Sequence, residues 1–190
     1  RKTVAVVTNM DEPLGKAVGN ALEVREAIDT LKGSGPEDLY ELVLILGSKL
    51  LVLAGKVDNE SEGRKMLIDV ANSGKAFEKF KELVRYQGGD VSYVENPELL
   101  PKAKYVIEVK SNKNGYVKSI NAEEVGKCAL ALGAGRETKE SQIDLSAGIV
   151  LNKKVDDKVE CGETLAYIHG NDIDKVEDVK NEEEFDFDLK

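Results

Sequence analysis

Histidine and cysteine, the residue types that build zinc sites and disulfides, are scarce in this chain, which has one histidine and two cysteines among 190 residues. Cys128 and Cys161 lie 33 residues apart without a CxxC pair, so with His169 they cannot complete a four-ligand zinc set. We expect both thiols to be small buried groups in a reducing compartment. The scarcity of these residue types argues against structural zinc and disulfides.

Basic clusters and long apolar runs are also missing. The net charge is −9 and aromatics make up 5% of the chain, which argues against a nucleic-acid partner. The longest apolar stretch, 39–53, is interrupted by polar and charged residues and is too broken to span a membrane. We therefore expect a cytoplasmic protein.

Familiar catalytic motifs are absent as well. The sequence has no GxxxxGK[ST], no GxGxxG after a strand, no HExxH and no GxSxG,. A Ser-His-Asp triad would have to use His169, which follows the strand-like run 165–168 and precedes the turn-like Gly170-Asn-Asp172. We interpret it as a surface histidine at a strand end, so no catalytic residue is predicted.

The first half of the chain predicts one strand followed by helices. Thr3–Val7 is a β-branched apolar run typical of a strand covered on both faces,, and a polar loop follows at 8–15. Helical spacing and end signals then predict helices over 17–31, 36–54, 58–71 and 73–87, with caps at Asp58 and Ser73 and the second a core helix. We expect an α/β domain over 1–100.

The second half changes to a period of two. Alternation predicts strands at 104–109 and 116–120 joined by an Asn114-Gly115 hairpin, and short strands over 143–168,. Asn121 and Glu124 resemble a capping box for a helix to Leu132. Residues 101–172 therefore predict a β-rich domain. Residues 171–190 hold nine acids against three lysines, and we interpret 173–190 as a solvent-facing acidic tail.

The loop 8–20 is the strongest candidate for a ligand site. A hard monovalent cation needs several oxygens, often carbonyls where a loop becomes a helix, and a carboxylate to offset its charge. The carbonyls of Leu14 and Ala17 and the carboxylate of Glu26 could form such a set. The alternative is that Asn9 and Asp11 make local turn bonds while Glu26 pairs with a lysine.

Four segments closely resemble the pyrimidine-nucleoside and thymidine phosphorylases: Thr8–Ala27, Gly133–Arg136, Ile143–Gly148 and Gly162–His169. The resemblance implies cleavage of a pyrimidine nucleoside by phosphate into a free base and a pentose 1-phosphate, as two domains close. It also implies a potassium ion, with Leu14, Ala17 and Glu26 matching the family's ligands on this side.

Parts of the family pattern have no counterpart here. The Lys-x-Ser-Thr-Gly-Gly phosphate loop, the residues that hold the pyrimidine and the helical domain that carries the homodimer contact are missing. The resemblance thus implies a fragment: the C-terminal part of a mixed-sheet α/β domain, then a hammerhead or barrel-sandwich-like β-rich domain. We expect no phosphorolysis from this chain alone.

Two other functions remain open. Val155–Leu165 resembles biotinyl and lipoyl carrier domains, but the Lys153-Lys154 turn lacks the Met or Asp flank of a modified lysine,. A non-catalytic binding or scaffold domain would use exposed apolar surface to engage a protein partner. A lysine adduct would identify a carrier.

Overall fold

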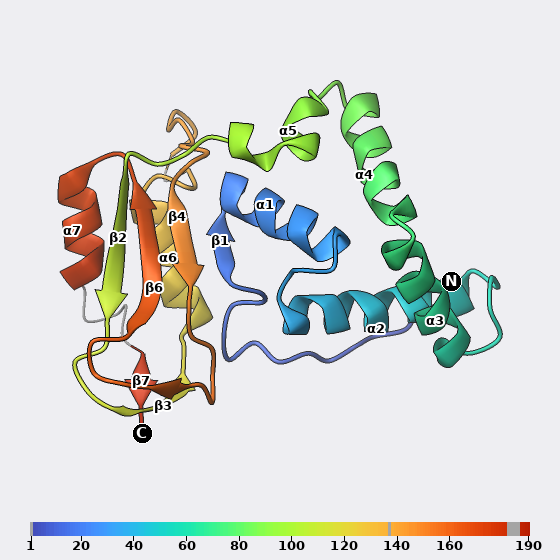
Figure 1. The fold of residues 1–190 in the computed structure, drawn as a ribbon, viewed down its shortest axis with the longest axis horizontal. Coiled ribbons are helices and arrows are strands. Elements are labelled where there is room, and N and C mark those ends of the chain that lie inside the picture. Colours follow the sequence, from blue (N-terminus) through green and yellow to red (C-terminus); the bar gives the residue numbers. More distant parts are fainter. Residues whose placement is uncertain (1, 137, 182–186) are drawn as a thin grey trace. The chain divides into compact units, whose positions relative to one another are not determined.

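The computed structural model describes residues 2–136, 138–181 and 187–190, which divide into two compact units (Figure 1). Unit 1 comprises Arg1–Thr8 and Arg25–Leu99, and unit 2 comprises Asn9–Val24 and Leu100–Lys190. The division falls within helix α1 (Asn20–Leu31). Residues 9–24 therefore belong to the same unit as the second half of the chain.

Unit 1 is helical over its described residues. After the last part of α1 come α2 (Glu37–Leu53), α3 (Glu60–Asn72), α4 (Lys75–Tyr86), the short α5 (Ser92–Glu95) and a 3-10 turn, η1 (Pro97–Leu99). Gly63 of α3 lies against Ser48 of α2: a Cβ added to Gly63 would be 3.0 Å from the Cα of Ser48. The ion pairs Arg64–Glu41 and Lys49–Glu60 join the same two helices. The predicted helical run is confirmed.

Two predicted helix caps are wrong by one residue. The side chain of Asn59, and not Asp58, accepts a hydrogen bond from the Glu62 amide at the start of α3. Gly74 precedes α4 in the left-handed conformation, while Ser73 ends α3. In both cases the neighbouring residue is also a cap former, so the sequence pattern does not fix the helix start to within one residue.

The predicted strand at Thr3–Val7 is also wrong. These residues form no strand, and Val7 is 98% exposed. A strand exists only when a neighbour takes its backbone hydrogen bonds, and the described part of unit 1 contains no sheet. The run has the composition of a buried strand, but no strand pairs with it among the described residues.

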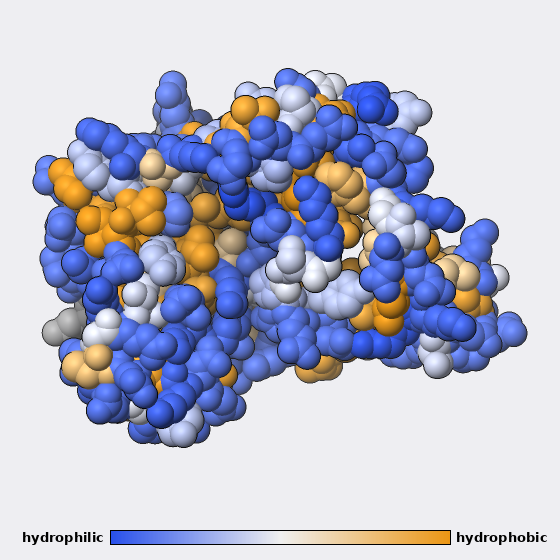
Figure 2. Space-filling view, in the orientation of Figure 1, coloured by the Kyte–Doolittle hydropathy of each residue, from blue (hydrophilic) through white to orange (hydrophobic). Residues whose placement is uncertain are grey.

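Helix α2 has one buried face and one exposed apolar face, so its prediction as a core helix is only partly right. Leu44 is buried, whereas Val43, Leu46 and Leu50 are exposed, Leu50 by 64%. Apolar patches interrupt the hydrophilic surface in Figure 2. Within the residues described, no helix combines the length and apolarity needed to cross a membrane.

Unit 2 contains two antiparallel sheets. The larger has the order β1 (Ala17–Gly19), β4 (Gly148–Leu151), β6 (Thr164–Gly170) and β2 (Tyr105–Lys110), and the smaller has the order β5 (Lys158–Val159), β3 (Gly115–Ser119) and β7 (Asp188–Leu189). Helices α6 (Ala122–Ala131) and α7 (Ile173–Asn181) pack against the larger sheet and each other (Figure 1). The predicted β-rich second half is confirmed.

The predicted hairpin at Asn114-Gly115 is wrong. Strand β2 pairs with β6, whereas β3 pairs with β5 and β7. The side-chain oxygen of Asn114 accepts the backbone N–H of Cys161 at 2.7 Å, so it stabilises a distant turn. The Asn-Gly pair marks a turn correctly, but the two strands on either side of it pair with other strands and not with each other.

The acidic C-terminal segment does more than face solvent. Asp172, Asp174, Glu177 and Asp178 are exposed, as predicted. However, residues 173–181 form α7, which buries Val176 and Val179 in the core of unit 2, and Phe187 is buried in the same cluster. The acids at 182–184 and 186 lie outside the described residues. The segment is therefore part of the core and not a separate tail.

The start of helix α1 differs from the prediction because a strand replaces its first turn. Ala17–Gly19 forms β1, with Gly19 opposite Gly148 in β4. The φ angles of these two glycines are 147° and 153°, and a Cβ on Gly148 would lie 2.3 Å from the Val18 carbonyl oxygen. Only glycine permits this approach of two backbones, so the helix begins at Asn20.

Candidate functional site

The candidate site begins with residues 9–16, the 9–16 loop, which unit 2 holds at several points. The Lys154 ammonium donates to the carbonyl oxygens of Pro13 at 2.5 Å and Gly15 at 2.7 Å. It also lies 3.6 Å from a carboxylate oxygen of Glu12. The other Glu12 oxygen accepts the Val155 amide at 2.8 Å. The turn after β4 thus carries the groups that hold this loop.

The end of the loop is tied to unit 2 by backbone and amide bonds. The Leu151 amide donates to the Lys16 carbonyl at 2.8 Å, and the Ala21 amide donates to the Leu145 carbonyl at 3.0 Å. The side-chain amide of Asn20 donates to the Ala134 carbonyl at 2.7 Å. These bonds bring together three segments that the sequence singled out: the loop 8–20, 133–136 and 143–148.

The predicted cation ligands fall on both sides of the division in α1. Leu14, which is 48% exposed, and Ala17, which is 7% exposed, belong to unit 2. Glu26 belongs to unit 1, is half-buried, and accepts the Thr30 hydroxyl on its backbone carbonyl at 2.8 Å. Two carbonyls and a carboxylate are oxygens that suit a hard cation. The set stays a prediction.

Asp144 organises the motif Ile143–Gly148 through hydrogen bonds. One of its carboxylate oxygens accepts the Ser146 amide and hydroxyl at 2.9 and 2.7 Å, and the other accepts the Asn171 side-chain amide at 2.6 Å. Asn171 in turn accepts the Lys104 amide at 2.8 Å. Burial opposes ionisation of Asp144, but bonds from Ser146, Asn171 and Ala147 outweigh it and lower its pKa,.

We predict that Asp144→Ala lowers the free energy of unfolding of unit 2 at pH 7 by about 2 kcal/mol, because charge-assisted hydrogen bonds are lost. A carboxyl with a lowered folded pKa stabilises above its unfolded pKa and loses that contribution as pH falls through the folded value,. The difference from the unaltered chain should therefore shrink below about pH 4.

Urea unfolding at several pH values measures this difference. Asp178→Ala, which removes an exposed carboxylate on α7, serves as the control and should change stability little. A pH-independent difference for Asp144→Ala would contradict the assignment.

His169 lies within strand β6, opposite Val106 on one side and Gly148 on the other. Burial lowers the pKa of its imidazole, which favours the neutral form at pH 7. It is the penultimate residue of β6, so the expected strand end is confirmed, but the residue is half-buried and not at the surface. Cys128 is buried as predicted, but Cys161 is exposed, so that prediction is wrong.

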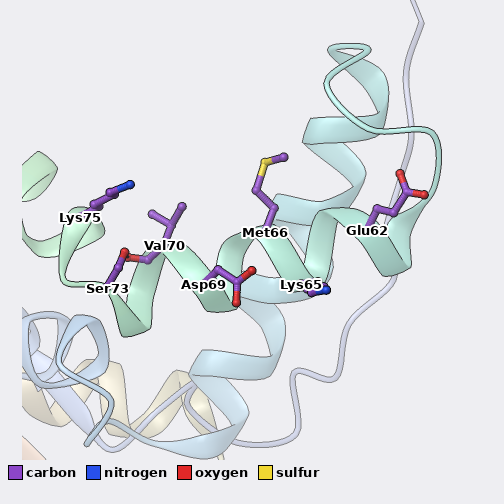
Figure 3. Close-up of a pocket in the computed structure, with 7 residues that line it drawn as sticks. All are labelled: Glu62, Lys65, Met66, Asp69, Val70, Ser73 and Lys75. Carbon is purple, nitrogen blue, oxygen red and sulfur yellow. The ribbon is translucent and has the colours of Figure 1, made fainter.

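An open groove of about 500 Å³ runs along α3 to the start of α4 (Figure 3). Met66 and Val70 project to the same side of α3 in this view. Its lining balances carboxylates against lysines: Glu62, Asp69, Lys65 and Lys75. It contains none of the predicted ligands, and no group of three metal-ligating side chains occurs anywhere in the described ranges.

Lys154 and Glu12 are functional candidates that sequence reasoning missed. The sequence drew attention to the Lys153-Lys154 turn only as a carrier attachment site. Lys153 donates to the Lys158 carbonyl at 2.9 Å and pairs with Glu163, and Lys154 binds the 9–16 loop. Their side chains are 15% and 16% exposed. Lysines whose ammonium groups are hydrogen-bonded and whose side chains are largely buried are poor sites for an attached prosthetic group, which argues against the carrier alternative.

Comparisons with known proteins identify similar sequences over both units. Residues 1–77 match a family model described as the a/b domain of a glycosyl transferase family, and residues 116–185 match the pyrimidine nucleoside phosphorylase C-terminal domain. Pyrimidine-nucleoside phosphorylases of Staphylococcus aureus strains USA300 and NCTC 8325 are 55% identical over 178 residues, and that of strain RF122 is 54% identical. Each alignment covers 93% of this chain and 41% of the relative.

Proposed function

Because the chain belongs to the pyrimidine-nucleoside phosphorylase family, we propose that it is part of an enzyme that cleaves pyrimidine nucleosides with phosphate. The products are a free base and a pentose 1-phosphate. The observation that carries this proposal is the 55% identity over 178 residues to phosphorylases, spread across both units. Phosphate is the co-substrate, and the whole protein is proposed to be a cytoplasmic homodimer.

The proposed role of this chain is to supply one side of the catalytic cleft. Its sequence contains no Lys-x-Ser-Thr-Gly-Gly segment of the kind that the family uses to hold phosphate, and it spans 41% of the length of its relatives. A cleft that lacks its phosphate donors cannot stabilise the charge that develops in the transition state. We therefore propose that the chain alone does not catalyse phosphorolysis.

Exposed apolar surface supports this partial role. The α/β family model covers residues 1–77, yet the described residues of unit 1 contain no sheet. Val7 and Leu50 are exposed although they lie in runs typical of buried elements. Such surface suits docking of further strands and helices of an α/β domain. We propose that residues 1–100 complete that domain and that 101–172 form a hammerhead-like domain.

A potassium ion is proposed at the oxygens of Leu14, Ala17 and Glu26. The ion would offset negative charge where phosphate binds and hold the start of α1 in place. The donor types support it: carbonyl and carboxylate oxygens are hard ligands, and one carboxylate matches one positive charge. The remaining ligands would come from outside this chain.

The test of the proposed function is complementation. We expect the 190-residue chain to release no base from thymidine or uridine with phosphate. Co-expressed with the part of a Staphylococcus aureus relative that its alignment leaves uncovered, it should yield base release well above that of either piece. Turnover by the chain alone would refute the partial role, and a folded complex without turnover would refute the enzymatic role.

A binding or scaffold function is the alternative. The same exposed residues, Val7 and Leu50, would suit an apolar protein partner,. In that case the added segment would improve solubility without producing base release, so the complementation experiment distinguishes the two functions.

A further inference from the structure

We propose that Lys154 is a positioning residue, which fixes the 9–16 loop so that the Leu14 carbonyl is held ready for the cation. This inference rests on the proposed potassium site. Lys154 is not itself a cation ligand. It acts through the backbone on either side of Leu14 and through Glu12.

The first support is the geometry of the ammonium group. Lys154 donates to the carbonyls of Pro13 and Gly15, the residues on either side of Leu14 in the sequence. Each carbonyl belongs to a planar peptide unit, so the peptides after Pro13 and after Gly15 are both held. The peptide after Leu14, whose carbonyl is the predicted ligand, lies between these two and has little freedom left.

The second support is burial. Pro13 and Gly15 are both buried, and a buried carbonyl without a donor is costly. Gly15 has φ 69°, so the chain turns sharply here and cannot use a regular ladder of backbone bonds. The Lys154 side chain is long and largely buried, so its ammonium is a donor that can reach two carbonyls at once,.

The third support is charge balance. An isolated ammonium beside a cation site would repel the cation. Here Glu12 lies 3.6 Å from Lys154 and also accepts the Val155 amide. The positive charge of Lys154 and the negative charge of Glu12 cancel, so this pair adds no net charge beside the loop. Loss of Lys154 would leave the Glu12 carboxylate unbalanced as well as two carbonyls without this donor.

Lys153 provides a matched control. It is the preceding residue, has the same side chain and is equally buried, with 15% exposed against 16%. Its ammonium donates to Lys158 and pairs with Glu163, and both of these partners lie beyond the turn and not in the 9–16 loop. A Lys→Met change at either position removes one charge and keeps a stem of similar length.

The experiment compares Lys154→Met, Lys153→Met and Lys154→Arg by amide hydrogen exchange of the 190-residue chain. The Val155 amide, which donates to Glu12, reports on the loop, and amides of β6 report on global stability. Relative to β6, we expect about tenfold faster exchange at Val155 in Lys154→Met and less than about twofold in Lys153→Met. Lys154→Arg should recover part of the protection, because it keeps the charge.

The second arm uses the complex of the chain with the uncovered part of the Staphylococcus aureus relative, which would supply the remaining ligands. It measures the melting temperature of that complex in potassium chloride against sodium chloride at equal ionic strength. We expect potassium to stabilise the complexes that contain the unaltered chain or Lys153→Met. The complex with Lys154→Met should respond less, and the complex with Glu26→Gln should lose the response while exchange at Val155 stays unchanged. Unchanged exchange in Lys154→Met, or a larger potassium response, overturns the positioning role. Faster exchange in Lys154→Met with no potassium response in the complex of the unaltered chain supports the anchoring by Lys154 and overturns the cation site.

Discussion

Deletion of residues 172–190 is expected to unfold unit 2. The deletion removes three buried apolar side chains from one core: Val176, Val179 and Phe187. Truncation of a large buried side chain costs about 2–5 kcal/mol, so the combined loss is roughly 6 kcal/mol or more. That is comparable with the whole stability of a typical domain, about 5–15 kcal/mol. It also removes strand β7 from β3.

Far-ultraviolet circular dichroism and urea unfolding measure the outcome. The matched control neutralises three exposed acids of α7 without touching its buried face: Asp174→Asn, Glu177→Gln and Asp178→Asn. This triple variant should remain folded, with a change in stability below about 1 kcal/mol. A deletion variant with native-like unfolding would show that the segment is a dispensable tail, as the sequence suggested.

The second large effect is expected for Gly148→Ala, with a loss of about 3 kcal/mol or more in the stability of unit 2. The added Cβ would lie 2.3 Å from the Val18 carbonyl oxygen and 3.0 Å from a methyl carbon of Leu22. The φ of 153° is itself unfavourable for a side chain. Backbone strain and overpacking each cost about 1–3 kcal/mol, and the nearest atom belongs to the backbone and cannot rotate away.

Gly126→Ala is the control for this prediction. Gly126 lies on the exposed side of α6, and a Cβ added there would meet no atom within 4 Å. Alanine is the better helix former, so this variant should gain about 0.5–1 kcal/mol. Chemical unfolding of both variants gives the comparison. Equal stability of Gly148→Ala and the unaltered chain would contradict the close approach of β1 and β4.

Local signals predicted the helices and the β-rich half because they depend on neighbours in sequence. The Asn121 side chain caps α6 as its spacing indicates, and the alternation of Tyr105–Lys110 gives a strand. Partners that are distant in sequence were not predictable in the same way. The Asn114-Gly115 turn does not join β2 to β3, because β2 pairs with β6, and no local pattern encodes that choice.

The candidate site shows the same limit. The sequence selected the loop 8–20 through its turn-forming residues and its resemblance to a family, but it gave no indication that Lys154 binds this loop. The bond from Lys154 to Gly15 joins positions that are 139 residues apart. A lysine in a polar turn has the same local pattern whether it is solvated or buried against a distant backbone. Only the fold distinguishes the two cases.

The placement of β1 has a consequence for the order in which the protein can form. Ala17 pairs with Val150, so a ribosome must synthesise more than 100 further residues after Ala17 before this edge of the larger sheet can close. Until then the strand within residues 9–24 has no pairing strand in the nascent chain. Contacts between residues so far apart in sequence also form slowly. Breaking the chain near residue 100, where the composition suggests a natural joint, would remove the outer strand and leave β4 open to pairing with other molecules.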